Sequence, residues 1–191
     1  MGRQIINSIA MLLSLTVLTG LVYPLAIVGL ANAVFPAQAQ GSLIESQGHV
    51  VGSRLIGQNF TQPGYFHGRP SAAGQDGYDA AQSSGSNLGP TNRKLINSVA
   101  DYAGQVRAEN GLGDNAAIPA DLATASASGL DPDISPAAAY LQIDRVAKER
   151  GLMPSEVRKL VEKNMRGRQL GIFGDPRVNV LDLNLDLDSL K

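Results

Sequence analysis

The longest apolar pattern in the chain is an uncharged run close to its beginning. No Asp, Glu, Lys or Arg occurs between Gln4 and Ile44, and the apolar part extends from Ile5 to Phe35. A helix needs roughly 20 apolar residues to cross the hydrocarbon core of a bilayer. Because this run is longer, it predicts one transmembrane helix over about residues 5–35 that is tilted, or kinked at Pro24.

The charges on either side of the run predict its orientation. Arg3 precedes it, and the next Lys or Arg is Arg54. Positive charges favour the cytoplasmic side, so we expect a single-pass protein with a cytoplasmic N-terminus. Two alternatives stay open. Ala37-Gln38-Ala39 fits a signal-peptide cleavage site, although signal peptides have a shorter apolar core of ~7–15 residues. A buried helix of a soluble protein is the other alternative, although no face of the run is polar.

Two small residues in the run are candidates for helix packing. Gly29 and Ala33 are four positions apart and therefore lie on one face of a helix. Such a face lets a second membrane helix approach closely. We therefore predict partner-helix packing at Gly29 and Ala33, with the alternative that small residues are simply common in membrane helices.

After the N-terminal segment, residues 1–40, the pattern changes to that of a loop-rich domain over residues 41–191. One or two strands are expected between Ser42 and Gly57, followed by an ordered loop at residues 58–78 that contains aromatic anchors. A helix is expected from a cap at Thr91 or Asn92 to Gly111. Its apolar face consists of Leu95, Val99, Tyr102 and Val106.

The last third of the chain predicts two more helices and a strand. Ser135-Pro136 is typical of a helix start, Gly151 of a helix end, and Pro154 of the next start. The segment LDLNLDLDSL then alternates strictly, which predicts a half-buried strand with an aspartate-rich wet face. The aspartates of that face are Asp182, Asp186 and Asp188. The order of elements predicts an α+β domain behind one transmembrane helix.

Composition excludes several classes of protein. The net charge of −1 and the pI near 6.1 give no indication of a nucleic-acid partner. The chain has no Cys, which excludes disulfides, thiolate catalysis and cysteine-based metal sites. It contains 21 Gly and 10 Pro, so many turns are expected in the soluble part.

The stretch SSGSNLGPTN, residues 83–92, has two possible roles. It lacks the phosphate-loop pattern G-x-x-x-x-G-K-[ST]. It nevertheless places backbone N–H groups ahead of a helix, where an anion is favoured. The candidates for such contacts are Ser84, Gly85, Ser86 and Asn87. The alternative is a turn that caps the helix.

No catalytic or metal site is expected with any specificity. His67 is the main candidate base, yet no G-x-S-x-G elbow occurs. His67 with Asp76 and Asp79 has no recognised ligand spacing. Arg69 is expected to pair with a nearby acid and to order the loop. A membrane-anchored or secreted hydrolase that uses His67 remains the alternative function.

Several motifs together resemble the C subunit of the bacterial high-affinity potassium-transporting P-type ATPase. They are GSRLIGQNF (52–60), YFHGRPSAA (65–73), SSGSNLGPTN (83–92), SGLDPDISPAAAYLQ (128–142) and GDPRVNVLDLNL (174–185). The resemblance implies a non-catalytic accessory subunit in the bacterial inner membrane. It also implies two partners, a catalytic P-type ATPase subunit and a channel-like potassium-translocating subunit.

The resemblance further implies a catalytic chaperone that holds the complex together and raises the ATP affinity of the catalytic subunit. It places a possible nucleotide contact at Ser83–Asn87, whose residues only loosely match an ABC-type signature loop. No firmly bound cofactor is expected, and ATP would be met only through the complex. Because the charges predict that this loop lies outside the cell, where ATP is scarce, we expect an indirect effect on ATP.

Overall fold

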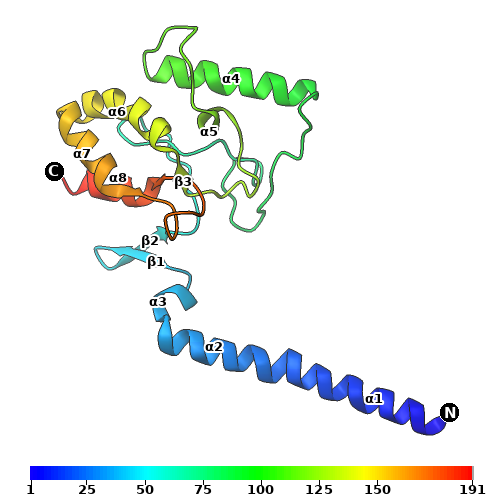
Figure 1. Cartoon of the computed structure of the whole chain (residues 1–191). Helices are drawn as coiled ribbons and strands as arrows, with labels where there is room; N and C mark the ends of the chain where they lie inside the picture. The colour runs from blue at the N-terminus through cyan, green and yellow to red at the C-terminus, as the bar shows by residue number, and fades with distance from the viewer. Residues whose placement is uncertain (191) are drawn as a thin grey trace. The chain divides into compact units, whose positions relative to one another are not determined.

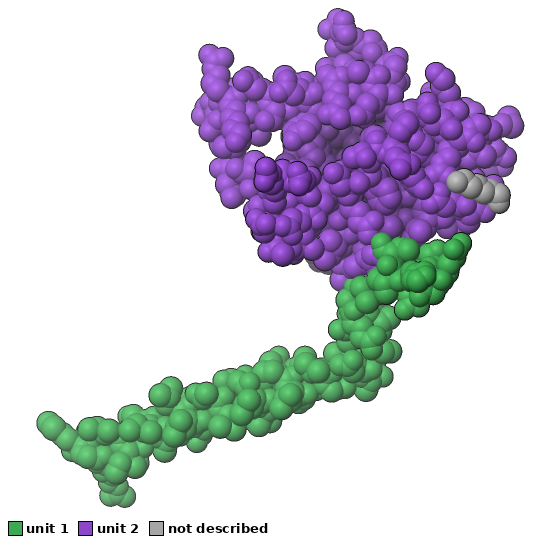
Figure 2. Space-filling model, turned by 180° about the vertical axis from the view of Figure 1, so that it is seen from behind, with its two compact units in different colours: residues 1–51 green, residues 52–191 purple. Residues whose placement is uncertain are grey.

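The computed structural model describes residues 1–190. The chain divides into two compact units, Met1–Val51 and Gly52 onward (Figure 2). The first is dominated by one apolar helix, and the second combines helices with a small sheet (Figure 1). The predicted α+β class with a single N-terminal membrane helix is therefore confirmed.

The apolar run forms one continuous helix of 33 residues, Gly2–Val34, within which an 18-residue stretch has a mean hydropathy of 2.1. It consists of α1 (Gly2–Val17), the π-helical turn η1 (Leu18–Val22) and α2 (Tyr23–Val34). At 1.5 Å per residue it is about 50 Å long, which exceeds the ~30 Å hydrocarbon core. None of its residues is buried within the chain, so its apolar surface needs lipid or another protein.

The helix accommodates Pro24 without a break. Proline has no backbone N–H, so the carbonyl one turn earlier loses its usual partner. The π turn η1 lies directly before this position, and π turns relieve such local mismatches. The predicted irregularity at Pro24 is thus a change of hydrogen-bond register.

A short helix and a hairpin follow the membrane helix. Helix α3 (Pro36–Ala39) precedes strands β1 (Leu43–Ser46) and β2 (His49–Ser53), which form a two-stranded sheet. The two-residue turn Gln47-Gly48 has positive φ at both positions, the conformation that matches the twist of a hairpin. The strands predicted between Ser42 and Gly57 are confirmed.

The second unit packs three helices against a three-stranded antiparallel sheet of order β3-β5-β4. Its elements are α4 (Arg93–Glu109), α5 (Ala120–Ala123), β3 (Asp133–Ile134), α6 (Pro136–Arg150), α7 (Pro154–Asn164), β4 (Met165–Arg166), β5 (Arg177–Asn179) and α8 (Val180–Asp188). The core lies between α6, α7, α8 and β5. Its fully buried members include Val146, Val157, Val161, Val178 and Leu183.

The predicted helix boundaries are confirmed at their caps. The side chain of Asn92 accepts a hydrogen bond from the Lys94 N–H at the start of α4, and that of Ser135 accepts one from the Ala138 N–H at the start of α6. Gly151 ends α6 in the left-handed conformation. These signals are local, because each capping bond joins the cap residue to the first or last turn of its own helix.

The strand predicted for residues 181–188 is wrong, because the segment forms helix α8. The side chain of Asn179 caps it by accepting from the Asp182 N–H. Residues 180, 181, 183, 184 and 187 are buried, and the separations of three and four residues among them are those of a helix face. Asn184 belongs to the buried face, so the strict alternation of Leu and polar residues concealed the helical period.

Candidate functional site

Two buried amide side chains hold the centre of the loop at residues 58–78. Asn184 on α8 accepts a hydrogen bond from the Phe66 N–H at 2.9 Å and donates one to the Phe66 carbonyl at 3.0 Å. Gln142 on α6 does the same for His67, accepting at 2.8 Å and donating at 3.1 Å. Each amide side chain bonds both the N–H and the carbonyl of one loop residue, as a neighbouring strand would do in a sheet. The loop is therefore held in place without belonging to a sheet.

Arg145 joins this loop to two helices. Its guanidinium donates to the carbonyls of Pro63 and Tyr65 and to the side-chain oxygens of Asn110 and Gln142. Burial lowers the pKa of Arg145, while the nearby Glu109 and Glu149 carboxylates oppose this effect. A buried cation with several acceptors is a positioning element for the loop and for the end of α4.

A cavity of about 240 Å³ lies between this loop and α4. Its polar lining includes His67, Arg69, Asp76, Tyr78, Tyr102 and Glu109. The loop supplies the first four of these side chains and α4 the last two. The cavity therefore brings together three residues that the sequence singled out, His67, Arg69 and Asp76, whereas Asp79 lies outside its lining.

His67 bridges the two walls of the cavity. Its Nδ1 lies 3.2 Å from Glu109 Oε2 and its Nε2 lies 3.1 Å from the Gln62 carbonyl oxygen. Both neighbours are acceptors, so the ring donates to both only as imidazolium. A general base needs a free nitrogen next to a nucleophile, and this geometry instead makes His67 a structural link.

Arg69 and Tyr78 order the rest of the loop. The predicted pairing of Arg69 with an acid is confirmed, because its Nη1 lies 2.9 Å from Asp131 Oδ2. Tyr78 donates its hydroxyl to the Arg69 carbonyl at 2.6 Å. Burial, helped by the Asp131 carboxylate, raises the pKa of Tyr78 to about 12. The phenol thus stays protonated and acts as a donor.

The glycine-containing stretch at Ser83–Asn87 lies outside the lining of this cavity. The Ser83 hydroxyl donates to the Ser128 carbonyl at 2.9 Å, and the Ser84 hydroxyl donates to the Ala72 carbonyl at 3.0 Å. A Cβ on Gly85 would lie 2.8 Å from the Ala127 carbonyl oxygen, so only glycine fits here. The cap of α4 comes from Asn92, and the stretch at 83–87 is an exposed loop that approaches the neighbouring backbone closely at Gly85.

The aspartates expected on a wet strand face have a different role on α8. Asp182 pairs with both Arg54 and Arg166, Asp186 pairs with Lys163, and Asp188 pairs with Arg150. Lys163 and Asn164 lower the pKa of Asp186 in spite of its partial burial. Among residues 1–190, no group of three His, Asp or Glu side chains is placed to hold a metal ion. The α8 carboxylates are therefore structural partners of basic side chains.

Gly29 and Ala33 lie on the exposed surface of α2. No atom of this chain would come within 4 Å of a Cβ on Gly29. The face is thus open in the isolated chain, as a packing surface for another helix requires.

The sequence did not indicate Gln142, Arg145 and Asn184 as organising residues. All three are buried polar side chains inside helices. The sequence marks them only as polar residues on the helix face that the 3.6-residue period turns toward the core. For Asn184 even this mark is missing, because the alternation of leucine and polar residues concealed the helical period.

Together, the unburied apolar helix and the α+β unit define a single-pass membrane protein whose charged side chains serve mainly structural contacts. The family model described as "KdpC: K+-transporting ATPase, c chain" matches residues 5–189. The chain therefore belongs to the KdpC family, and the resemblance seen in its motifs is confirmed.

Relatives of the chain match it over its full length. Three proteins described as "Potassium-transporting ATPase KdpC subunit" come from Rhodopseudomonas palustris (strain BisB18), Koribacter versatilis and Gemmatimonas aurantiaca. They are 55%, 52% and 57% identical, respectively. The alignments cover 100% of this chain and 100%, 97% and 95% of these relatives, so the similarity includes the membrane helix as well as the soluble unit.

Proposed function

We propose that the chain is the accessory subunit of an ATP-driven potassium uptake pump in the bacterial inner membrane. It stabilises the assembly of a catalytic P-type ATPase subunit with a potassium-translocating, channel-like subunit. The observation that carries this proposal is the family match from residue 5 to residue 189, which includes both the membrane helix and the soluble unit. The relatives named above are themselves described as subunits of a potassium-transporting ATPase.

The charges flanking the helix support an N-terminus in the cytoplasm and a soluble unit outside the cell. Arg3 lies before the helix, and no further Lys or Arg occurs until Arg54. In this orientation the soluble unit does not share a compartment with ATP. An increase in the ATP affinity of the catalytic subunit then arises by coupling: the accessory subunit binds one conformation of the pump more tightly and shifts the population toward it.

The contacts of the stretch at 83–87 also favour an indirect effect. The hydroxyls of Ser83 and Ser84 already donate to backbone carbonyls of the same unit. A phosphate would need those donors or freely pointing N–H groups. We therefore assign this loop to the packing of the soluble unit and its exposed surface to a contact with a partner protein. The hydrolase alternative has less support, because both ring nitrogens of His67 face acceptors.

Enlarging the small face of α2 should weaken the complex. Gly29→Leu and Ala33→Leu insert bulk where a partner helix packs closely, and overpacking a tight contact costs about 1–3 kcal/mol. We expect less of the pump subunits to co-purify with the tagged variants in mild detergent. The measurement is the ratio of subunits after affinity purification from potassium-starved cells.

Ala31→Leu is the matched control, because residue 31 lies on the opposite face of the helix. It should co-purify the same amount of partner as the unmodified chain. If Gly29→Leu and Ala33→Leu behave like Ala31→Leu, this face of α2 is not the interface.

The same preparation tests the proposed function itself. A full-length chain that co-purifies with a P-type ATPase subunit, identified by mass spectrometry, supports the accessory role. A solitary chain that begins at Gln40 would show cleavage after Ala37-Gln38-Ala39 and would reject both the anchor and the role.

A further inference from the structure

The connection between β4 and β5 exposes a cluster of large apolar side chains. Leu170 is 88% exposed, Ile172 71% and Phe173 62%. These three residues form the tip of the loop at residues 167–175, which we call the apolar tip loop. Exposed apolar residues are ordinary when they are scattered, but a contiguous group at the end of a protruding loop is typical of a contact surface.

The apolar tip loop is held in one conformation. The N–H of Gln169 donates to the Phe173 carbonyl, and the N–H of Phe173 donates to the Gln169 carbonyl, each at 2.9 Å. Leu170 has a φ of 53° and Gly171 a φ of 76°, so a bulky residue occupies the left-handed region at the tip. The apolar side chains are therefore presented on a closed, strained turn.

The apolar tip loop begins near the residues with which the chain enters the second unit. The second unit starts at Gly52, and Arg54 Nε lies 3.0 Å from Asp182 Oδ1. Arg166, the last residue of β4, places its Nη2 2.6 Å from Asp182 Oδ2. One carboxylate thus joins the first residues of the unit to the base of the loop.

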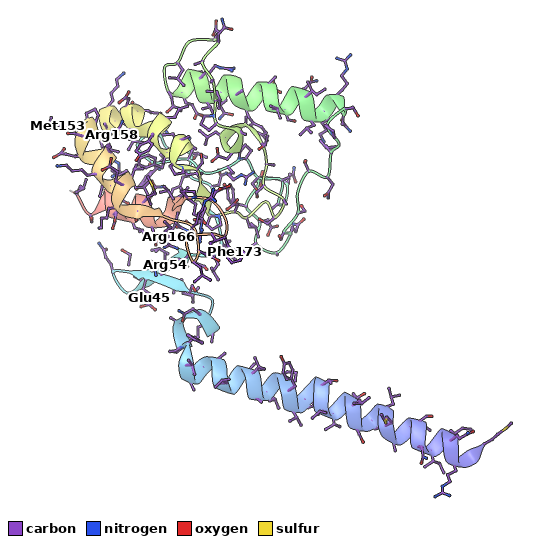
Figure 3. All side chains as sticks on the ribbon, viewed as in Figure 1. Glu45, Arg54, Met153, Arg158, Arg166 and Phe173 are labelled. Carbon is purple, nitrogen blue, oxygen red and sulfur yellow. The ribbon has the colours of Figure 1, made fainter. Side chains whose placement is uncertain are left out.

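Figure 3 shows where these residues lie within the second unit. Phe173, Arg166 and Arg54 are found toward one end of it, and Met153 and Arg158 are well separated from them. The end of the unit that carries the apolar tip is therefore also the end to which the membrane tether is attached.

The base of the loop carries positive charge. Arg54 and Arg166 share the single carboxylate of Asp182, which leaves one positive charge in excess there. Arg168 pairs with Asp175, and both side chains are exposed. Apolar side chains at a tip with arginines at its base are the combination that favours an interface of lipid acyl chains and anionic headgroups.

We propose that the apolar tip loop is a second membrane contact, in which Leu170, Ile172 and Phe173 enter the bilayer interface and Arg54 and Arg166 face lipid phosphates. The occupant of this surface is lipid, because the chain that follows the membrane helix enters the unit at Gly52, beside the base of the loop, and the charge of this base complements anionic headgroups. The inference rests on the membrane helix alone and is independent of the pump's subunits, so its failure would leave the proposed function standing.

The absence of Trp from the sequence allows a direct test. The full-length Phe173→Trp variant is reconstituted in vesicles of phosphatidylethanolamine and phosphatidylglycerol, with and without bromine on the acyl chains close to the headgroup. We expect a blue-shifted emission that is largely quenched in the brominated vesicles. Met153→Trp is the matched control, since Met153 is exposed in the same unit but far from the loop, and its emission should remain unquenched.

Removing the apolar neighbours gives a second readout. In the background of Phe173→Trp, the changes Leu170→Ser and Ile172→Ser should abolish the quenching while the far-ultraviolet circular dichroism stays the same. Two results would overturn the proposal. One is an indole that is equally exposed to water in both kinds of vesicle. The other is an indole that is shielded only in the purified pump complex and insensitive to brominated lipid, which would make the loop a protein interface.

Discussion

Replacing Arg145 with methionine should destabilise the soluble unit by roughly 2–4 kcal/mol, because three partly buried acceptors lose their donor and a polar group left without a partner costs about 1–3 kcal/mol when it is fully buried. The change removes the donor for the Pro63 and Tyr65 carbonyls and for the Asn110 side chain. Methionine retains most of the volume, so the loss reflects hydrogen bonds more than packing. The measurement is thermal unfolding of the full-length chain in detergent, followed by circular dichroism.

Arg158→Met is the control for this prediction. Arg158 is exposed on α7, and its guanidinium lies 4.9 Å above the Tyr140 ring without any of the carbonyl contacts of Arg145. The same substitution there should cost less than about 1 kcal/mol. Equal unfolding temperatures for the two variants would refute the role assigned to Arg145.

Asn184→Leu should cost about 2–4 kcal/mol, since it leaves the buried N–H and carbonyl of Phe66 without partners. Leucine is similar in size, so a cavity contributes little. We expect the loop at residues 58–78 to become mobile before the core of α6 and α7 unfolds. Hydrogen exchange of the Phe66 and His67 amides measures this directly, because local opening exposes them.

Two further variants define the cause of that loss. Asn184→Asp keeps an acceptor for the Phe66 N–H but, when ionised, has no donor for its carbonyl, so it should also be destabilised. Asn97→Leu changes an exposed residue of α4 and should leave exchange at residues 66 and 67 unaltered. If the Phe66 and His67 amides still exchange slowly in Asn184→Leu, the hydrogen bonds of the Asn184 side chain to Phe66 are not needed to hold the loop.

The parts of the fold that the sequence predicted depend on local chemistry. The caps at Asn92, Ser135 and Gly151 bond within one turn of their own helices, and the membrane helix follows from apolar length alone. The strands expected between Ser42 and Gly57 likewise form within one short segment, although their pairing as a hairpin was not predicted. For these elements, a single short segment contains all the information that determines the structure.

The parts that the sequence did not predict depend on contacts between distant segments. Asn184 is 118 positions from Phe66, and Gln142 is 75 positions from His67. Nothing close to Asn184 in the chain indicates that a loop needs its amide, so the alternating leucines suggested a strand. The excess of aspartates on α8 was also explained only when Arg54, Arg150 and Lys163 were found opposite them.

The candidate site residues also divide into those whose contacts the sequence predicted and those whose contacts depend on distant segments. The pairing of Arg69 was predictable in kind, because an arginine inside an ordered loop needs an acid. The contacts of Ser83 and Ser84 were not, because their acceptors at Ser128 and Ala72 belong to other loops. A glycine-containing stretch can pack against backbone or bind a phosphate, and only its neighbours distinguish the two.

The side of the membrane on which the soluble unit lies is the most direct test of indirect coupling to ATP. The chain has no Cys, so Met153→Cys and Gln4→Cys each give a single labelling site at an exposed position. We predict that a membrane-impermeant maleimide labels Met153→Cys in intact spheroplasts and labels Gln4→Cys only after the membrane is permeabilised. The opposite pattern would place the soluble unit and its loop at residues 83–87 in the cytoplasm with ATP, and would contradict the account.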